Sequence, residues 1–88
     1  MVTIVAVSNV WQLLLYNFYM EIKEKFGDRL KELRIKNNLS QRELAKKLNI
    51  SKTAINYWEK GLRTPTLDVV INIADYFGVT LDYLSGRD

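Results

Sequence analysis

The sequence contains no cysteine and no histidine, and it has a single proline among 88 residues. Without cysteine there is no disulfide framework, and without both residue types a zinc module is excluded. The same absences remove the usual general base and the thiolate nucleophile, so hydrolytic triads and Cys-His dyads cannot form. No glycine-rich phosphate-binding loop is present either. We therefore expect a protein that is not an enzyme and that has no cofactor and no small-molecule ligand.

Residues that break secondary structure are also few: the sequence has only Pro65 and four glycines. A chain of this length forms one domain around one hydrophobic core. Between the breaks, apolar residues recur every three or four positions, and no strand-like alternation is found from residue 20 to 88. The expected fold class is all-α.

The net charge is only +3, but basic and acidic residues are distributed unevenly along the chain. Residues 29–63 hold ten basic side chains against three acidic ones, a balance of +7. Residues 1–28 and 64–88 are slightly acidic. A basic block within a mild average is typical of a surface that binds a polyanion, although lysines and arginines that merely solvate amphipathic helices would produce the same count.

Capping residues mark the helices between these breaks. One helix is predicted from Ile22 to the asparagines at 37 and 38, and Gly27 is expected to loosen it near its start. Ser40 and Glu43 form a capping-box pattern for a second, and Ser51 can cap a third that stops at Gly61. Thr66 opens a fourth helix and Thr80 a short fifth one, with Leu81 and Leu84 turned inward. The fourth is apolar on two sides, which predicts that it is the centre of the core.

Residues 40–61 resemble the helix-turn-helix of the lambda-repressor-like family, also called Cro/cI or XRE, and read SQRELAKKLNISKTAINYWEKG. Ala45 is small enough for two helices to approach each other, and Ile50, Ile55 and Trp58 can fill the wedge between them. The family usually has glycine at the position of Asn49, where the backbone is left-handed, and asparagine tolerates that conformation next best. The likeness extends from about Phe26 to Leu84.

This resemblance implies a compact five-helix DNA-binding domain over residues 20–88, whose third helix lies in the major groove. Ile55 and Trp58 turn one side of that helix to the core, so the opposite side is free to read bases. The expected base-contacting residues are Lys52, Thr53, Asn56 and Tyr57. Asn56 can bond adenine bidentately, Thr53 can offer a methyl group to thymine, and Lys52 can donate to guanine or phosphate.

Phosphate contacts are expected from residues that flank the third helix. By resemblance, Gln41 contributes a backbone N–H at a helix N-terminus, and Lys60 and Arg63 contribute positive charge. The family likeness also implies that Arg34 pairs with Glu59 and braces the third helix without reading DNA. Lys46 and Lys47 are excluded as ordinary solubilising charges.

The family likeness does not cover residues 1–19, of which 14 are apolar or aromatic and none is charged. A signal peptide would need a positive start, and a membrane span would need fewer polar interruptions, so we do not expect a membrane protein. We expect an arm that packs against a second copy, contributing to dimerisation, or back on the body of its own chain. Val2 to Val7 would be extended, and Ser8 or Asn9 would cap a helix with Val10, Leu13, Leu14 and Phe18 on one side. An alternative is that the natural start is Met20 and that the first 19 residues are an upstream extension.

The sequence thus predicts a cytoplasmic transcriptional regulator, a repressor or autoregulator of bacterial or phage origin. It would bind a pseudopalindromic site on double-stranded DNA as a homodimer. An alternative is an antitoxin-like protein that binds DNA with the same fold and also neutralises a protein partner.

Overall fold

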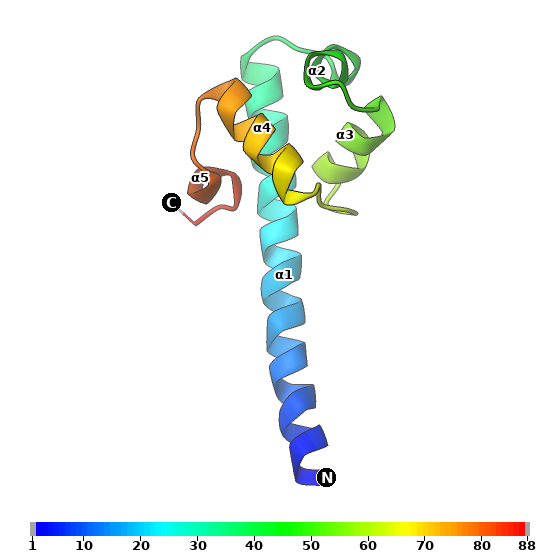
Figure 1. Ribbon diagram of the computed structural model, residues 1–88, viewed down its shortest axis with the longest axis vertical. Helices are drawn as coiled ribbons and strands as arrows, with labels where there is room; N and C mark the ends of the chain where they lie inside the picture. Colours follow the sequence, from blue (N-terminus) through cyan, green and yellow to red (C-terminus); the bar gives the residue numbers. More distant parts are fainter. Residues whose placement is uncertain (1, 88) are drawn as a thin grey trace.

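The computed structural model describes the backbone of residues 2–87 and the side chains of residues 10–87. This part of the chain contains no strand and five helices: α1 (Val2–Lys36), α2 (Gln41–Leu48), α3 (Lys52–Glu59), α4 (Leu67–Phe77) and α5 (Leu81–Leu84). Helices α2 to α5 pack against the C-terminal half of α1, which keeps one side exposed, and the N-terminal half of α1 projects away from them (Figure 1). The predicted all-α class and the five-helix domain are confirmed.

Every helix contributes one fully buried aliphatic side chain to a single core: Leu30, Leu44, Ile55, Ile73 and Leu84. Burying a side chain of this size contributes about 1.5–3 kcal/mol to folding. Phe26 and Leu33 of α1 and Trp58 of α3 complete the apolar contacts. Among the residues whose side chains are described, all the buried ones lie between Phe26 and Leu84. The five-helix body formed by this part of the chain therefore closes its core without the projecting part of α1.

The prediction that the fourth helix is the centre of the core was wrong. Only Ile73 and Ala74 of α4 are buried, whereas Leu67, Ile71 and Tyr76 are exposed. The centre is α1, which has α3 and α5 packed against it. Ile73 and Ala74 belong to different apolar stripes of α4, so both stripes reach the core, but only where they adjoin, and the residues farther round the helix face solvent.

The predicted side-chain caps of α2 and α3 are present, whereas Thr66 precedes α4 without making a side-chain capping bond. Ser40 Oγ accepts a hydrogen bond from the Glu43 backbone N–H, and the Glu43 carboxylate accepts one from the Ser40 N–H. These bonds favour the charged carboxylate and hold the pKa of Glu43 below its usual value. Ser51 caps α3 in the same manner. Between the two helices Asn49 has a φ of 56°, the left-handed conformation expected there.

The short helix α5 follows the prediction in part. Thr80 Oγ1 caps it by accepting from the Tyr83 N–H, and Leu84 is buried. Leu81 was expected to point inward but is 43% exposed. A helix of four residues has room for only one side chain fully inside the core, so Leu81 lies at the edge.

The extended piece predicted for Val2 to Val7 is helical, and no cap forms at Ser8 or Asn9, because α1 runs unbroken through both. No proline or glycine precedes Gly27, so no residue there terminates a helix, and β-branched residues lower helix propensity only slightly. The helix also continues without a break across residues 19 and 20, where the arm was expected to end and the domain to begin. Among the residues described, none of the helices combines the length and apolarity needed to cross a membrane.

Gly27 does not loosen α1, as its position near the expected helix start suggested. It is buried where α3 crosses α1, and a Cβ atom at this position would collide with the Trp58 carbonyl oxygen. The absence of a side chain therefore lets the C-terminal end of α3 lie directly against the backbone of α1.

Candidate nucleic-acid interface

Helix α3 has one side in the core and the other in solvent. Ile55 and Trp58 are buried, and the predicted DNA-facing residues on the other side are exposed, with the exception of the half-buried Asn56. Lys52, Thr53 and Asn56 together line a shallow hollow of about 150 Å³. An ammonium group, a hydroxyl and an amide therefore converge on one place, where the edge of a base pair could be bonded.

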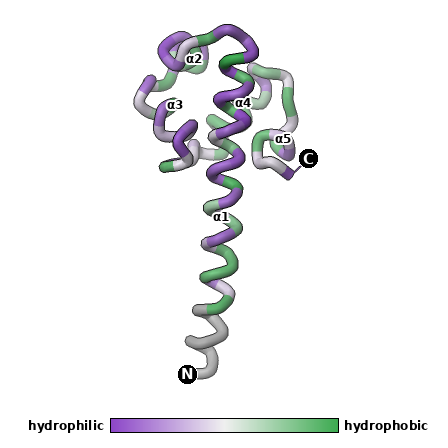
Figure 2. Tube along the Cα trace, turned by 180° about the vertical axis from the view of Figure 1, so that it is seen from behind, coloured by the Kyte–Doolittle hydropathy of each residue, from purple (hydrophilic) through white to green (hydrophobic). Residues whose placement is uncertain are grey.

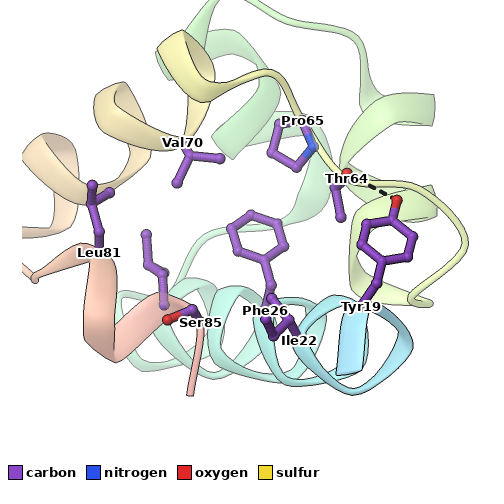
Figure 3. A pocket seen from close by; sticks show the side chains of 9 residues that line it. Tyr19, Ile22, Phe26, Thr64, Pro65, Val70, Leu81 and Ser85 are labelled. Atoms are coloured by element: carbon purple, nitrogen blue, oxygen red, sulfur yellow. Dashed lines mark hydrogen bonds between the residues drawn. The ribbon is translucent and has the colours of Figure 1, made fainter. Parts of the chain in front are cut away.

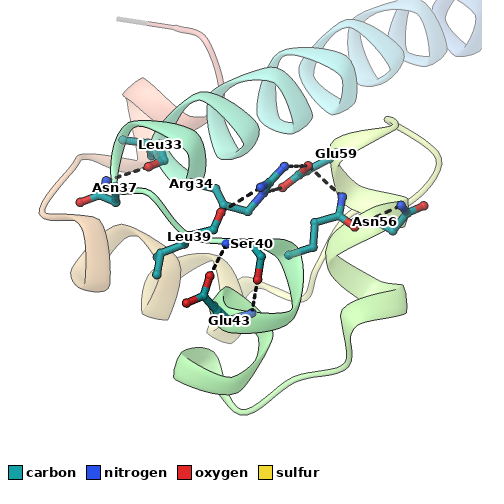
Figure 4. A network of polar contacts seen from close by, with 9 residues as sticks. Leu33, Arg34, Asn37, Leu39, Ser40, Glu43, Asn56 and Glu59 are labelled. Carbon is teal, nitrogen blue, oxygen red and sulfur yellow. Dashed lines mark hydrogen bonds and ion pairs between the residues drawn. The ribbon is translucent and has the colours of Figure 1, made fainter.

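A bidentate ion pair anchors the inner side of this helix to α1. Arg34 Nε donates to Glu59 Oε2 at 2.7 Å, and a second guanidinium nitrogen donates to Oε1 at 3.0 Å (Figure 4). The Arg34 and Glu59 side chains are only 12% and 4% exposed. The hydrogen bonds and charge of Glu59 raise the pKa of Arg34, so the guanidinium keeps its charge. Arg34 also donates to the Leu39 carbonyl, which joins α1, the α1–α2 turn and α3.

Gln41 extends this network to the DNA-facing side. Its Nε2 atom donates to Glu59 Oε1 at 3.0 Å, and its Oε1 atom accepts from Asn56 Nδ2 at 3.3 Å. The amide of Asn56 is thereby oriented, with its Oδ1 atom and its second N–H left for other partners. Those are the two groups that a bidentate contact with adenine uses. The backbone N–H of Gln41 stands at the first position of α2, where no intrahelical acceptor is available.

Tyr57 and Arg63 come together beside α3. The Arg63 guanidinium lies 5.6 Å from the centre of the Tyr57 ring, and both side chains are exposed. They border an open hollow of about 550 Å³ between α3 and the loop that leads to α4. The ring holds the arginine next to the DNA-facing side of α3 through a cation–π contact. Lys60, also exposed, follows directly after α3.

The structure thus places the four expected base-contacting residues on one side of α3, with Lys60 and Arg63 at its end. Sequence reasoning did not foresee the bonds from Gln41 to Glu59 and Asn56. The only signal was the capping box, which fixes Gln41 at the first position of α2, because the partners are 18 and 15 residues away in the chain. The contact between Arg63 and Tyr57 crosses a loop and has no periodic signal.

Comparison with known proteins decides the family. A family described as helix-turn-helix (HTH_3) matches residues 30–84, which is more than half of the chain. The chain belongs to the HTH_3 helix-turn-helix family. The resemblance seen in residues 40–61 is therefore confirmed, and it places the chain in a family of DNA-binding transcriptional regulators.

Several curated relatives of this HTH_3 chain are named transcriptional regulators. The activator BcrR of Enterococcus faecalis is 40% identical over 65 residues, which cover 73% of this chain and 32% of BcrR. The regulator ImmR of Bacillus subtilis is 39% identical over 62 residues, 70% of this chain and 49% of ImmR. This HTH_3 chain therefore spans about a third to a half of the length of these relatives.

A solved structure has the same fold. It is an HTH_3 family transcriptional regulator from Vibrio cholerae, with a TM-score of 0.68 at 24% identity over 80% of this chain and 39% of that one. A further relative, the cryptic phage CTXphi repressor RstR of Vibrio cholerae, is 30% identical over 56 residues, 64% of this chain and 50% of RstR. The residues matched by the family, 30–84, lie in the helical body and do not include the projecting part of α1.

Proposed function

We propose that this HTH_3 protein binds duplex DNA in a sequence-specific manner and represses transcription, its own included, in the cytoplasm. Helix α3 would lie in the major groove, with Lys52, Thr53, Asn56 and Tyr57 directed to base edges. Gln41, Lys60 and Arg63 would bind phosphates, and Arg34 and Glu59 would brace the helix from inside.

The convergence of Lys52, Thr53 and Asn56 on one hollow carries this proposal. Lys52 and Thr53 are exposed, and the half-buried Asn56 is held by Gln41 with part of its amide left for another partner. None of the three side chains belongs to the hydrophobic core. Positive charge stands at the end of the same helix, which suits the phosphates on both sides of a groove. The buried Arg34–Glu59 pair holds α3 against α1, so the reading side is preorganised.

The proposed assembly is a homodimer on a pseudopalindromic site. Two identical bodies would place two α3 helices in successive major grooves, about 10–10.5 base pairs apart. A dimer also doubles the number of phosphate contacts, so its binding would weaken more steeply with salt than that of one body.

Alanine variants separate the two kinds of contact. Thr53→Ala is expected to cost about 1–3 kcal/mol on the preferred site and much less on unrelated duplexes, since it removes a contact with one base. Lys60→Ala and Arg63→Ala are expected to weaken binding to both kinds of DNA alike, because phosphates carry no sequence. Fluorescence anisotropy on matched duplexes measures both effects, and Lys46→Ala is the control.

Loss of the same factor on preferred and unrelated DNA for Thr53→Ala would remove it from the base-reading set. A loss for Lys46→Ala as large as that for Arg63→Ala would show that general charge, and not the end of α3, drives binding.

A further inference from the structure

The projecting half of α1 exposes apolar side chains all round, Leu13 and Tyr16 among them, but two of its sides differ in the residues that follow them along the helix. One side carries Trp11, Leu15, Tyr19 and Ile22, which we call the arm stripe, and it continues at intervals of three or four residues into the core residues Phe26, Leu30 and Leu33. The other side begins with Val10 and Leu14 and continues into Asn17, Glu21, Glu24 and Asp28. One side of the helix thus leads into the core, and the other leads onto charged residues.

The arm stripe remains exposed where the body ends. Trp11 and Leu15 are 61% and 63% exposed, and no described part of this chain covers them. The hydropathy colouring shows that the coloured part of the projecting helix is mostly apolar, whereas polar and apolar residues are mixed in the body (Figure 2). An apolar stripe of this length on a monomer marks a surface that contacts another molecule.

At the foot of the body the arm stripe opens into an apolar hollow of about 240 Å³ (Figure 3). Tyr19, Ile22 and Phe26 of α1 form one wall of this hollow. The remaining walls include Pro65, Val70 and Leu81. The Tyr19 hydroxyl lies 3.5 Å from Thr64 Oγ1, so this ring is held at the rim. A helix lying on the arm stripe would therefore end in an apolar recess.

We infer that the occupant of the arm stripe is α1 of a second copy of this chain, running antiparallel. No charged residue occurs before Glu21, so two copies can approach without like-charge repulsion. Trp11 and Tyr19 are 61% and 47% exposed, which gives about 200 Å² of aromatic surface per copy if a buried aromatic covers 150–250 Å². Leu15 and the walls of the hollow extend this area toward the roughly 800 Å² per partner of a standard interface.

The direction follows from the position of the body. The body stands over the same side of α1 as the arm stripe, because the stripe continues into the core (Figure 1). Two copies that faced each other by this side in parallel would place both bodies in the same space. The antiparallel arrangement puts the bodies at opposite ends and points each N-terminal end toward the hollow of the other copy.

Two neighbouring leucines give a matched test in the full-length chain without DNA. Leu15→Glu places a charge on the arm stripe and is expected to weaken dimerisation about 100-fold in sedimentation equilibrium. Leu14→Glu places the same charge on the other side and is expected to leave dimerisation within a factor of about three. Leu14 and Leu15 are 55% and 63% exposed, so neither substitution affects the core. A monomeric wild-type chain, or equal losses for both variants, would overturn the inference.

Because the chain has no cysteine, single cysteines report the direction. Near the centre of an antiparallel pair, Gln12→Cys is expected to form a disulfide between copies under mild oxidation. Tyr19→Cys is not expected to form one. Residue 19 lies seven residues from that centre in each copy, so at 1.5 Å per residue the two cysteines would be about 20 Å apart, and a disulfide needs Cα atoms within about 7 Å. Cross-linking of both variants would mean a parallel pair and would contradict the antiparallel assignment.

This inference names the surface for the homodimer proposed above, but its failure is distinguishable from failure of DNA binding. Leu15→Glu is expected to bind a single half-site with wild-type affinity, because α3 lies in the body and not on the arm stripe. Loss of half-site binding in this variant would contradict that separation.

Discussion

Gly27→Ala is expected to lower the melting temperature by roughly 10–20 °C, corresponding to a loss of about 2–3 kcal/mol of folding free energy. A Cβ at this position would collide with the Trp58 carbonyl oxygen and lie 2.9 Å from the Glu59 carbonyl oxygen. Both obstacles are backbone atoms near the end of α3, so they cannot move aside by a change of rotamer. Helix α3 must shift away from α1, and the ion pair beneath it must stretch.

The expected loss of stability is opposite in sign to the usual effect of replacing glycine by alanine in a helix. Inside an unobstructed helix, replacing glycine by alanine stabilises by about 0.5–1 kcal/mol, because alanine loses less backbone freedom on folding. Thermal unfolding followed by circular dichroism compares Gly27→Ala with the adjacent exposed control Asp28→Ala, which is expected to stay within about 0.5 kcal/mol. A melting temperature unchanged or raised by Gly27→Ala would mean that α3 does not lie against α1 as described.

Glu59→Ala is expected to destabilise the fold by about 2–4 kcal/mol and to impair DNA binding as well. It leaves the Arg34 guanidinium, which is only 12% exposed, without its carboxylate. It also removes the acceptor for the Gln41 amide, so Asn56 loses its fixed orientation. Stability and base recognition are therefore expected to fall together.

Urea unfolding and DNA titration of the same variants separate these two effects. Glu59→Gln keeps an oxygen for Arg34 but loses the charge, and it is expected to fall between wild type and Glu59→Ala. Glu32→Ala removes an exposed carboxylate on α1 and is the control for charge alone. An unfolding curve that Glu59→Ala leaves unchanged would refute the bracing role of the pair.

Much of the helix-turn-helix could be predicted from sequence because its signals are local. The capping box of Ser40 and Glu43 and the left-handed Asn49 depend on residues at most four apart, and the structure has both. The alternation of buried and exposed positions in α3 follows from its periodicity, which is why Ile55 and Trp58 were placed inward and Thr53 outward.

Features that depend on tertiary packing were missed. The two apolar stripes of α4 predicted a central helix, but periodicity does not tell whether a partner covers each stripe, and Leu67 remains 68% exposed. Gly27 was interpreted through its own flexibility, whereas its role depends on the backbone of α3. The N-terminal segment was expected to be partly extended, but the residues that the structure describes include no strand to pair with it, and a helix forms its backbone bonds within the segment itself.

The central claim, that α3 reads duplex DNA, is tested most directly by selecting duplexes from a random pool and measuring affinity for the enriched sequence at several salt concentrations. The account predicts a common motif, with log affinity falling by about 0.9 per phosphate contact for each unit of log salt. It also predicts that Thr53→Ala lowers affinity for the motif more than for unrelated DNA. Failure of the wild-type chain to bind any duplex at low salt, or enrichment of no motif, would contradict it.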